Sequence, residues 1–136
     1  RIDCLPDGRL HLIDYKTGAP PTQAMQKSFS KQLLLAAAMA ERGGFAELAA
    51  IEVALITYIG LGAGQKVEET KITSDLLALE WAKLTTLIGR YMERDTFYAA
   101  RRALFEQRYA RSYDHLARFG EWQMTDRAMP VRVGAP

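Results

Sequence analysis

Short runs of alternating hydrophobic and polar residues open the chain, and longer helix-like patterns follow them. The runs "RIDCL" and "RLHLIDY" flank "PDG" at residues 6–8, which predicts a tight β-hairpin because glycine accepts a positive φ. The β-branched stretch "IEVALITYIG" predicts a central strand, and the alternating "KVEETKI" predicts a further strand. We therefore expect a sheet of several strands.

The segment "KQLLLAAAMAER" predicts a helix that runs to about Arg42, where a pair of glycines stops it. We expect Ser28 or Ser30 to cap its start, and residues 19–30 before it to form a loop stiffened by two prolines. Because the helix is apolar on nearly every side, it should be buried on several sides.

A long amphipathic helix is predicted over "TSDLLALEWAKLTTLIGRYMER", with Thr73 or Ser74 as its cap. Its apolar side chains recur at helical spacing, at Leu77, Trp81, Leu84 and Ile88. The pattern weakens after Thr96, and we expect a short helix around Tyr113 to Trp122. The order hairpin, helix, strand, strand, helix predicts an α/β fold with helices packed on a sheet.

The composition is that of an ordinary globular chain. The 136 residues are 49% hydrophobic and 25% charged, with a formal net charge of +2. The longest apolar run, Leu33 to Ala40, is too short to span a bilayer, so we expect no membrane partner. The single cysteine, Cys4, excludes an intramolecular disulfide and is most simply explained by a reducing compartment, so we expect a cytoplasmic location.

We expect residues 1–136 to form a single domain, with 97–136 as a partly irregular C-terminal extension. The sequence opens inside a strand pattern, so we expect this domain to be truncated at its N-terminus. The glycine-rich "GLGAGQK" at 60–66 lacks the spacing of a nucleotide phosphate loop and is followed by a strand-like run rather than a helix. We therefore expect an ordinary turn there.

The distribution of charge is more informative than its sum. Residues 90–118 hold seven arginines and six aromatic residues. Arginine interleaved with aromatic side chains suits phosphate contact and base stacking, although a solvated helix face with aromatic core contacts explains the same pattern. The candidates for contact with nucleic acid are Arg101, Arg102, Arg108, Tyr109 and Arg111.

Two carboxylates, Asp3 and Asp14, stand in the two strands of the predicted hairpin. A two-residue turn at 8–9 would place them directly opposite each other, with Cβ atoms about 4.5–5.5 Å apart. A turn at 7–8 would instead place Asp3 opposite Leu12, and both registers remain open. Opposed carboxylates repel each other unless a cation lies between them, which Mg²⁺ or Mn²⁺ can do.

Lys16 follows Asp14 by two residues and therefore lies on the same face of the strand. A metal ion held by Asp3 and Asp14 beside a lysine suits the hydrolysis of phosphodiester bonds. The ion acidifies a bound water, and the lysine orients that water and stabilises the developing negative charge. The alternative is a surface salt bridge between an aspartate and a lysine at the end of a hairpin.

The combination of "RID", "LHLIDYKTG" and "KSFSKQLLLAAAMA" resembles the PD-(D/E)xK nuclease domain of the RecB type. In that family an aspartate on one strand precedes an aspartate–tyrosine–lysine on the next, and a glutamine opens the following helix. The positions that match, in order and approximate spacing, are Asp3, Asp14, Lys16 and Gln32.

The resemblance implies a restriction-endonuclease-like mixed β-sheet flanked by helices, and a deoxyribonuclease that depends on Mg²⁺ or Mn²⁺. It implies that Asp3 and Asp14 are metal ligands, that Tyr15 lends its backbone carbonyl to the metal, and that Lys16 is the catalytic lysine. Gln32 would contact the water, the metal shell or the DNA.

The stretch "SYDHLARFGEW" is similar to the C-terminal end of the B subunit of AddAB-type double-strand-break repair helicase–nucleases from bacteria. This similarity implies an exonuclease domain that acts on DNA, most naturally a single strand delivered by a helicase, with an A-type helicase–nuclease subunit as partner. Two alternatives are a non-catalytic DNA-binding or scaffold module that keeps the fold, and a stand-alone RecB-like exonuclease of the phage or CRISPR-associated type.

The chain also departs from the family pattern. The tyrosine that often follows the helix glutamine by four residues is replaced by Ala36. Relatives usually carry a further acidic residue or histidine on a helix upstream of "RID", and the sequence begins after that point. With Cys4 alone, the chain is not expected to hold the iron–sulfur cluster of some relatives.

Overall fold

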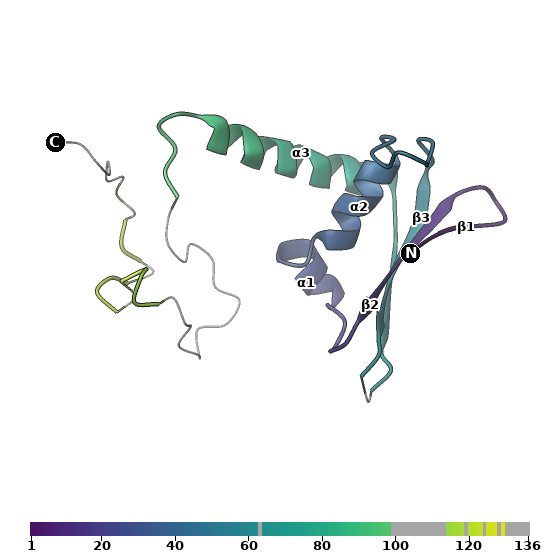
Figure 1. The fold of residues 1–136 in the computed structure, drawn as a ribbon, viewed down its shortest axis with the longest axis horizontal. Helices are drawn as coiled ribbons and strands as arrows, with labels where there is room; N and C mark the ends of the chain where they lie inside the picture. Colours follow the sequence, from purple (N-terminus) through teal and green to yellow (C-terminus); the bar gives the residue numbers. More distant parts are fainter. Residues whose placement is uncertain (63, 99–113, 119, 124, 128, 130–136) are drawn as a thin grey trace. The chain divides into compact units, whose positions relative to one another are not determined.

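The computed structural model describes residues 1–62, 64–98, 114–118, 120–123, 125–127 and 129. The chain falls into two compact units, Arg1–Ile88 and Gly89–Pro136. The sheet, the two shorter helices and most of the long third helix belong to the first unit (Figure 1). In the part of the chain that is described, no helix is long and apolar enough to cross a membrane.

Four strands form one mixed sheet in the order β1-β2-β3-β4. β1 pairs antiparallel with β2, β2 parallel with β3, and β3 antiparallel with β4. With the helices in chain order, the elements are β1 (Ile2–Cys4), β2 (Leu10–Lys16), α1 (Gln23–Ser28), α2 (Gln32–Ala40), β3 (Val53–Gly60), β4 (Val67–Lys71) and α3 (Ser74–Met92). The predicted α/β fold, a mixed sheet with flanking helices, is confirmed.

The helical region before β3 differs from the prediction. The segment expected to be a loop contains α1, which begins after Thr22, whose side chain accepts a hydrogen bond from the backbone N–H of Met25. Ser28 is the last residue of α1 rather than the cap of α2, and α2 begins after Lys31 without a side-chain cap. Two prolines before Thr22 do not prevent α1, because proline is tolerated ahead of the first helical turn.

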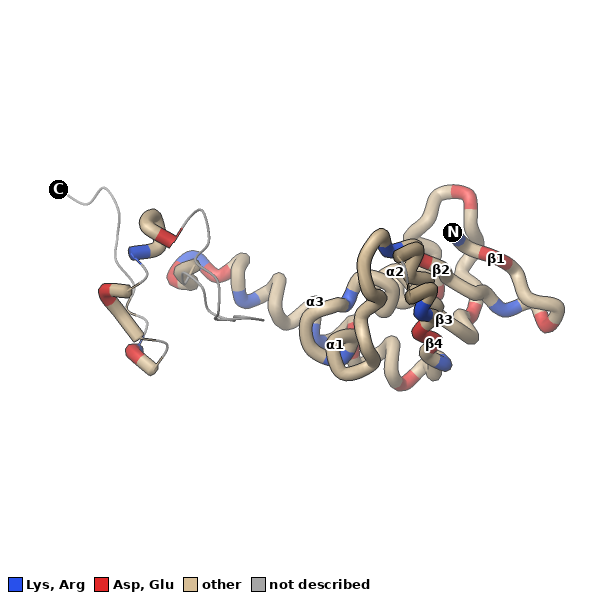
Figure 2. The backbone as a smooth tube through the Cα atoms, turned by 90° about the horizontal axis from the view of Figure 1, so that it is seen from below, with Lys and Arg blue, Asp and Glu red and all other residues tan. Residues whose placement is uncertain are grey.

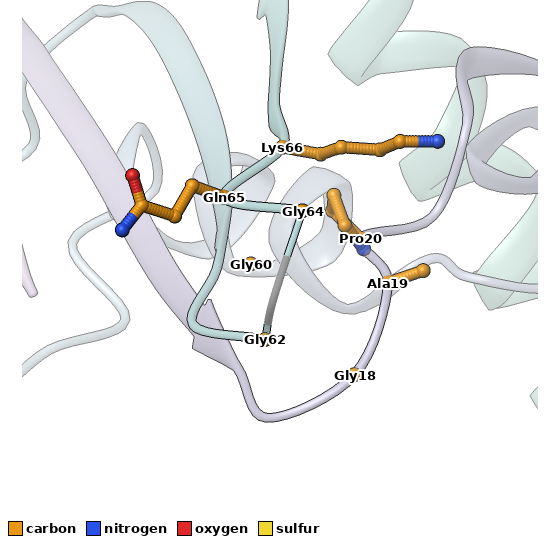
Figure 3. Close-up of a pocket in the computed structure, with 8 residues that line it drawn as sticks. All are labelled: Gly18, Ala19, Pro20, Gly60, Gly62, Gly64, Gln65 and Lys66. Atoms are coloured by element: carbon orange, nitrogen blue, oxygen red, sulfur yellow. The ribbon is translucent and has the colours of Figure 1, made fainter.

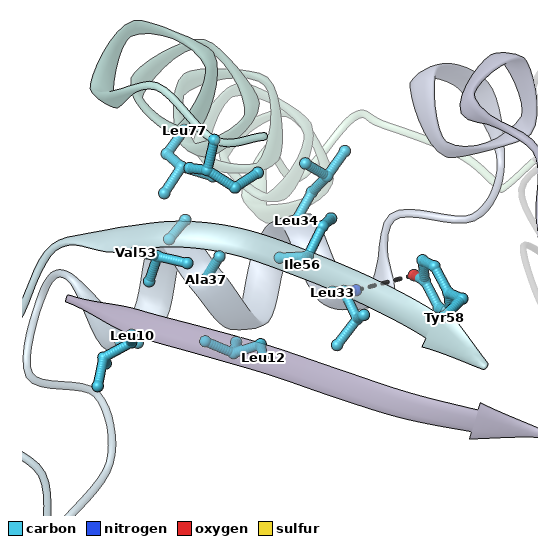
Figure 4. Packing of buried hydrophobic residues seen from close by; sticks show 12 residues of the cluster. Leu10, Leu12, Leu33, Leu34, Ala37, Val53, Ile56, Tyr58 and Leu77 are labelled. Atoms are coloured by element: carbon cyan, nitrogen blue, oxygen red, sulfur yellow. Dashed lines mark hydrogen bonds between the residues drawn. The ribbon is translucent and has the colours of Figure 1, made fainter. Parts of the chain in front are cut away.

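The core lies between α2 and one face of the sheet (Figure 4). Leu33, Leu34 and Ala37 of α2 are buried there. The strand residues that they cover are Leu10, Leu12, Val53, Ile56 and Tyr58. They alternate along each strand except between Val53 and Ile56, where the pairing of β2 with β3 shifts its register. The apolar character of α2 on nearly every side therefore corresponds to its burial, as predicted.

Only the start of α3 joins this core. Leu77 is fully buried and Trp81 packs partly against the cluster. Further along the predicted apolar stripe, Ile88 is 51% exposed. Thr73 caps the helix as expected, because its hydroxyl accepts a hydrogen bond from the backbone N–H of Leu76.

The hairpin between β1 and β2 has a loop of three residues, 6–8. The backbone N–H of Gly8 donates to the carbonyl of Leu5 at 2.9 Å, and the N–H of Leu5 donates to the carbonyl of Arg9 at 2.8 Å. Gly8 has a φ of +84°. A turn followed by a glycine in the left-handed region is the usual form of a three-residue hairpin loop.

This loop sets a register that neither of the two predicted turns provides. Asp3 lies opposite His11, not opposite Asp14 or Leu12. Both predicted registers are therefore wrong. A shift of one residue moves every side chain of a strand to the other face of the sheet, so the consequence for Asp3 is large.

Candidate functional site

Three of the four predicted catalytic residues come together where β2 ends and α2 begins. The Lys16 ammonium lies 2.7 Å from Asp14 Oδ2 and donates a hydrogen bond of 2.8 Å to Gln32 Oε1. Gln32 Nε2 donates to Asp14 Oδ1 at 3.4 Å, which closes the contacts into a triangle. We call these three residues the Asp-Lys-Gln cluster.

Strand alternation and helix packing explain this meeting. Asp14 and Lys16 lie on the same face of β2 as Leu10 and Leu12, the face that α2 covers. Gln32 is the first residue of α2 and therefore stands at the end of the helix nearest the end of β2.

Tyr58 joins this site, although no role was predicted for it from the sequence. It lies beside Asp14 in the register of β2 and β3, and its hydroxyl accepts a hydrogen bond of 3.1 Å from the backbone N–H of Leu33 (Figure 4). The Lys16 ammonium lies 5.6 Å from the centre of its ring. Burial raises the pKa of the Tyr58 phenol, and the hydrogen bond from Leu33 opposes that shift. The available signal was the single aromatic residue of a strand that is otherwise largely aliphatic.

The Asp14 carboxylate is unusual in its hydrogen bonding. Its Oδ2 atom is removed from solvent and has no hydrogen-bond partner, while its side chain as a whole is 21% exposed. The Lys16 ammonium is close enough for a charge–charge contact with this oxygen but is not aligned as a donor to it. This oxygen therefore has a cation beside it but no aligned donor, so its lone pairs can also bind a metal ion.

The backbone of Tyr15 is directed toward the β1 side of β2. The N–H and carbonyl of Ile13 exchange hydrogen bonds with Arg1, and backbone groups two residues apart point to the same side. Lys16, one residue further, directs its carbonyl the other way, to the N–H of Leu61.

The structure does not bring Asp3 to the cluster. As the partner of His11, Asp3 lies on the opposite face of the sheet from Asp14. It accepts a hydrogen bond of 2.9 Å from Arg1 Nε, and this bond lowers the pKa of the Asp3 carboxyl. The expectation that the carboxylates of residues 3 and 14 converge on one ion is therefore not supported, because the hairpin loop has three residues.

The predicted nucleic-acid contacts lie in another part of the chain. Arg101, Arg102, Arg108, Tyr109 and Arg111 fall outside the described residues. The described residues 114–118 form turns instead of the predicted helix.

A cavity of about 360 Å³ lies beside the cluster. Lys16, Gln32 and Tyr58 line it on the side of the sheet and α2. Phe29 and Lys31, from the connection between α1 and α2, are also part of its lining. The volume is within the usual range of ligand pockets, about 300–1,000 Å³.

A second cavity, also of about 360 Å³, lies between residues 18–20 and the turn that joins β3 to β4 (Figure 3). A Cβ atom at Gly60 would lie 3.0 Å from Pro20 Cδ and 3.2 Å from the carbonyl of Lys66, so glycine permits the close approach of the two loops. The glycine-rich segment is a turn that leads into β4, as expected, and not the phosphate loop of a nucleotide-binding protein.

The oxygen donors of the site fit a hard divalent cation. Among the described residues, no group of three or more His, Cys, Asp or Glu side chains could hold a metal ion. Mg²⁺, however, is commonly bound through one or two carboxylates, with waters and substrate phosphates as further ligands. The Asp14 carboxylate, with its buried Oδ2, and the backbone carbonyl of the next residue, Tyr15, are oxygen donors of the kind used in that mode of binding.

The comparison with protein families agrees with this chemistry. The model of the PD-(D/E)XK nuclease superfamily matches residues 1–127. Searches of curated proteins and of solved structures give no significant match. The match covers the hairpin, the cluster and helices α1, α2 and α3, and it confirms the superfamily but not the finer resemblance to an AddAB B subunit. The chain thus belongs to the PD-(D/E)XK nuclease superfamily, whose members are nucleases that generally use divalent metal ions.

Proposed function

We propose that this chain hydrolyses phosphodiester bonds in DNA with Mg²⁺ or Mn²⁺, and that the Asp-Lys-Gln cluster is its reactive centre. The observation that carries the proposal is the closed triangle of carboxylate, ammonium and amide beside a cavity. An ordinary surface salt bridge needs neither the amide nor a carboxylate oxygen that is removed from solvent.

Each member of the cluster has a distinct role in this proposal. Asp14 and the Tyr15 carbonyl would hold the ion, which when bound offsets charge on the scissile phosphate and acidifies a water. The Lys16 ammonium orients the attacking water and stabilises the negative charge that develops on the phosphate. Gln32 accepts a hydrogen bond from Lys16 and donates one to Asp14, so it positions both side chains.

Asp3 has no role in this centre. In the observed register it lies opposite His11, on the other face of the sheet from Asp14.

The test compares two identical chemical changes on opposite faces of the sheet. We expect Asp14→Asn to slow Mg²⁺-dependent cleavage of labelled DNA by the full chain by at least about a hundredfold, because loss of a metal ligand removes several kcal/mol of stabilisation. Asp3→Asn should cleave at nearly the wild-type rate. If Asp14→Asn, shown by urea denaturation to be folded, cleaved DNA at the wild-type rate, the proposal would be refuted.

A non-catalytic DNA-binding or scaffold role is the second candidate. It is favoured by one observation, the single carboxylate in the described part of the site. Calorimetric titration with Mn²⁺ separates the two functions. Binding that disappears in Asp14→Asn supports the nuclease, and the absence of binding to the wild type supports the scaffold.

We also propose, from the sequence resemblance at residues 112–122, that the chain is the exonuclease domain of a cytoplasmic bacterial helicase–nuclease complex for double-strand-break repair. Its partner would be an A-type subunit, and its substrate the single strand that the helicase delivers. Co-purification of the full-length protein with a helicase subunit tests this assignment. A stand-alone exonuclease would purify alone and degrade DNA ends without ATP.

A further inference from the structure

A second lysine lies in line with the lysine of the proposed centre. In the pairing of β2 with β3, Lys16 lies opposite Gly60. The backbone N–H of Gly60 in turn donates to the carbonyl of Lys66 at 2.8 Å, just before β4 begins. Neighbouring strands lie about 4.7–4.9 Å apart, so the backbones of the two lysines are separated by about 9–10 Å.

Lys66 lies on the same face of the sheet as the Asp-Lys-Gln cluster. Tyr58, in the wall of the centre, pairs with Glu68 of β4, and successive side chains of a strand alternate between the two faces. Lys66 precedes Glu68 by two residues and therefore shares its face. Figure 3 shows the Lys66 side chain extended on the side of the cavity that Ala19 and Pro20 form.

The cavity drawn in Figure 3 adjoins the cavity beside the cluster. Ala19 lines both of them, so it forms part of the wall between them. Among the described residues that line the cavity of Figure 3, Lys66 is the only one with a charged side chain. This lysine is therefore the cation next to the reactive centre on the β4 side.

The Lys66 ammonium is exposed and has no carboxylate partner. Among the described residues it forms no ion pair, not even with Glu68 on the same face of β4, whereas Lys16 and Lys31 each pair with a carboxylate. Residues 17–40, which hold α1 and α2, contain two lysines and no aspartate or glutamate (Figure 2). The elements on this face of the sheet thus add no negative charge of their own.

We propose that Lys66 binds a second phosphate of the DNA backbone, within about three nucleotides of the phosphate that reacts at the cluster. The inference rests on the proposed function and adds a substrate-binding residue to it. Phosphates recur about every 3.4 Å along the axis of each DNA strand, so a separation of about 9–10 Å covers no more than about three nucleotides. A lysine without a carboxylate partner can bind such a phosphate without breaking an ion pair.

A contact of this kind positions a strand but does not read its sequence. Lys66 should therefore contribute equally to the binding of DNA of any sequence. Its contribution should weaken as the salt concentration rises, because each phosphate contact releases counterions from the DNA.

The first experiment measures binding by the full chain in EDTA, so no metal-dependent cleavage occurs. Fluorescence anisotropy follows labelled DNA over a series of salt concentrations, and the slope of the logarithm of the binding constant against the logarithm of salt reports the number of phosphate contacts. We expect Lys66→Gln to reduce the size of this slope by about 0.7–0.9, the value for one contact, and Lys66→Arg to keep the wild-type slope.

Lys71→Gln is the matched control. Lys71 is also exposed on β4 and forms no ion pair with a described residue, but it lies opposite Leu55, on the other face of the sheet. Its replacement removes the same charge and should leave the slope unchanged.

The second experiment locates the phosphate. A methylphosphonate replaces one phosphate of the DNA at a time and removes its charge, and the cleaved bond is mapped separately with Mg²⁺. In the wild type, replacement at one position within about three nucleotides of that bond should weaken binding. In Lys66→Gln, replacement at the same position should have no further effect.

An unchanged slope in Lys66→Gln, an equal decrease in Lys71→Gln, or no binding of DNA by the wild type would each overturn the inference. If Lys66→Gln alone reduces the slope but the wild type does not cleave DNA with Mg²⁺ or Mn²⁺, the proposed reaction is rejected and the phosphate contact stands. If cleavage depends on Asp14 while the slope is unchanged in Lys66→Gln, only the phosphate contact is rejected.

Discussion

The substitution Tyr58→Phe removes one oxygen atom from the wall of the site and tests how the start of α2 is held. The Tyr58 hydroxyl accepts the backbone N–H of Leu33 at 3.1 Å, and the two residues are 1% and 6% exposed. The first N–H groups of a helix have no partner inside the helix, and α2 has no side-chain cap. Phenylalanine would therefore leave the Leu33 N–H buried without a partner.

The cost of such a change can be bounded. Leaving one buried donor unsatisfied costs about 1–3 kcal/mol. The substitution also relieves the burial of the phenol oxygen, the same burial that raises the pKa of Tyr58, so the net loss should lie near about 1–2 kcal/mol. With a urea m-value of about 2 kcal/mol per molar, the middle of the usual range, the midpoint should fall by roughly 0.5–1 M.

Urea unfolding followed by tryptophan fluorescence measures this shift, because Trp81 packs partly against the core. Tyr98→Phe is the control, since Tyr98 is 80% exposed and its ring stacks on Tyr91 with or without the hydroxyl. Its free energy of unfolding should change by less than about 0.5 kcal/mol. A wild-type midpoint in Tyr58→Phe would refute the capping role of the Tyr58 hydroxyl.

Three further substitutions test the packing around the site. Leu77→Ala should cost about 2–5 kcal/mol in urea unfolding because Leu77 is fully buried, whereas Leu79→Ala should cost little. Gly60→Ala should lower the free energy of unfolding by about 1–3 kcal/mol, because its Cβ atom would lie 3.0 Å from a proline carbon. Gly64→Ala is the control and should cost less, because the nearest atom to its Cβ would be 3.8 Å away. Burial raises the pKa of Glu80, but two lysine side chains lower it to a net value below its ordinary one. The stabilisation from this carboxylate is therefore present above the unfolded pKa of about 4.3 and lost as pH falls through the folded pKa, so the stability gap between wild type and Glu80→Gln should narrow below about pH 4 in urea titrations.

Local patterns predicted most of the elements correctly, because their causes are local. β3 is rich in β-branched residues and pairs with a strand on each side, and the α3 cap at Thr73 needs only the hydroxyl and the first helical turn. α1 was missed because two prolines suggested a loop, although Thr22 followed them with a good capping side chain. Tyr58 could not be predicted, because its partner, the N–H of Leu33, depends on where α2 packs.

The placement of the candidate site shows which spatial relations are independent of tertiary structure. Asp14 and Lys16 share a face in any register, because they are two residues apart on one strand. The face of the sheet on which Asp3 lies depends instead on the number of residues in the hairpin loop. Both predicted two-residue turns would place Asp3 on the same face as Asp14.

The sequence nevertheless held the information that decides the loop. Pro6 follows the first residue of the turn and Gly8 ends it, and this placement of proline and glycine favours a turn from Leu5 to Gly8 with the glycine in the left-handed region. Such a turn gives three loop residues and reverses the face of Asp3. The pairing of Asp14 with Lys16 thus survives any error in the hairpin, whereas a ligand on the neighbouring strand can be identified only after its turn has been assigned. For this reason Asp3→Asn is the more informative of the two aspartate substitutions. If Asp3 is a metal ligand, as the motif match implies, cleavage should be lost, whereas the observed register predicts that cleavage is kept.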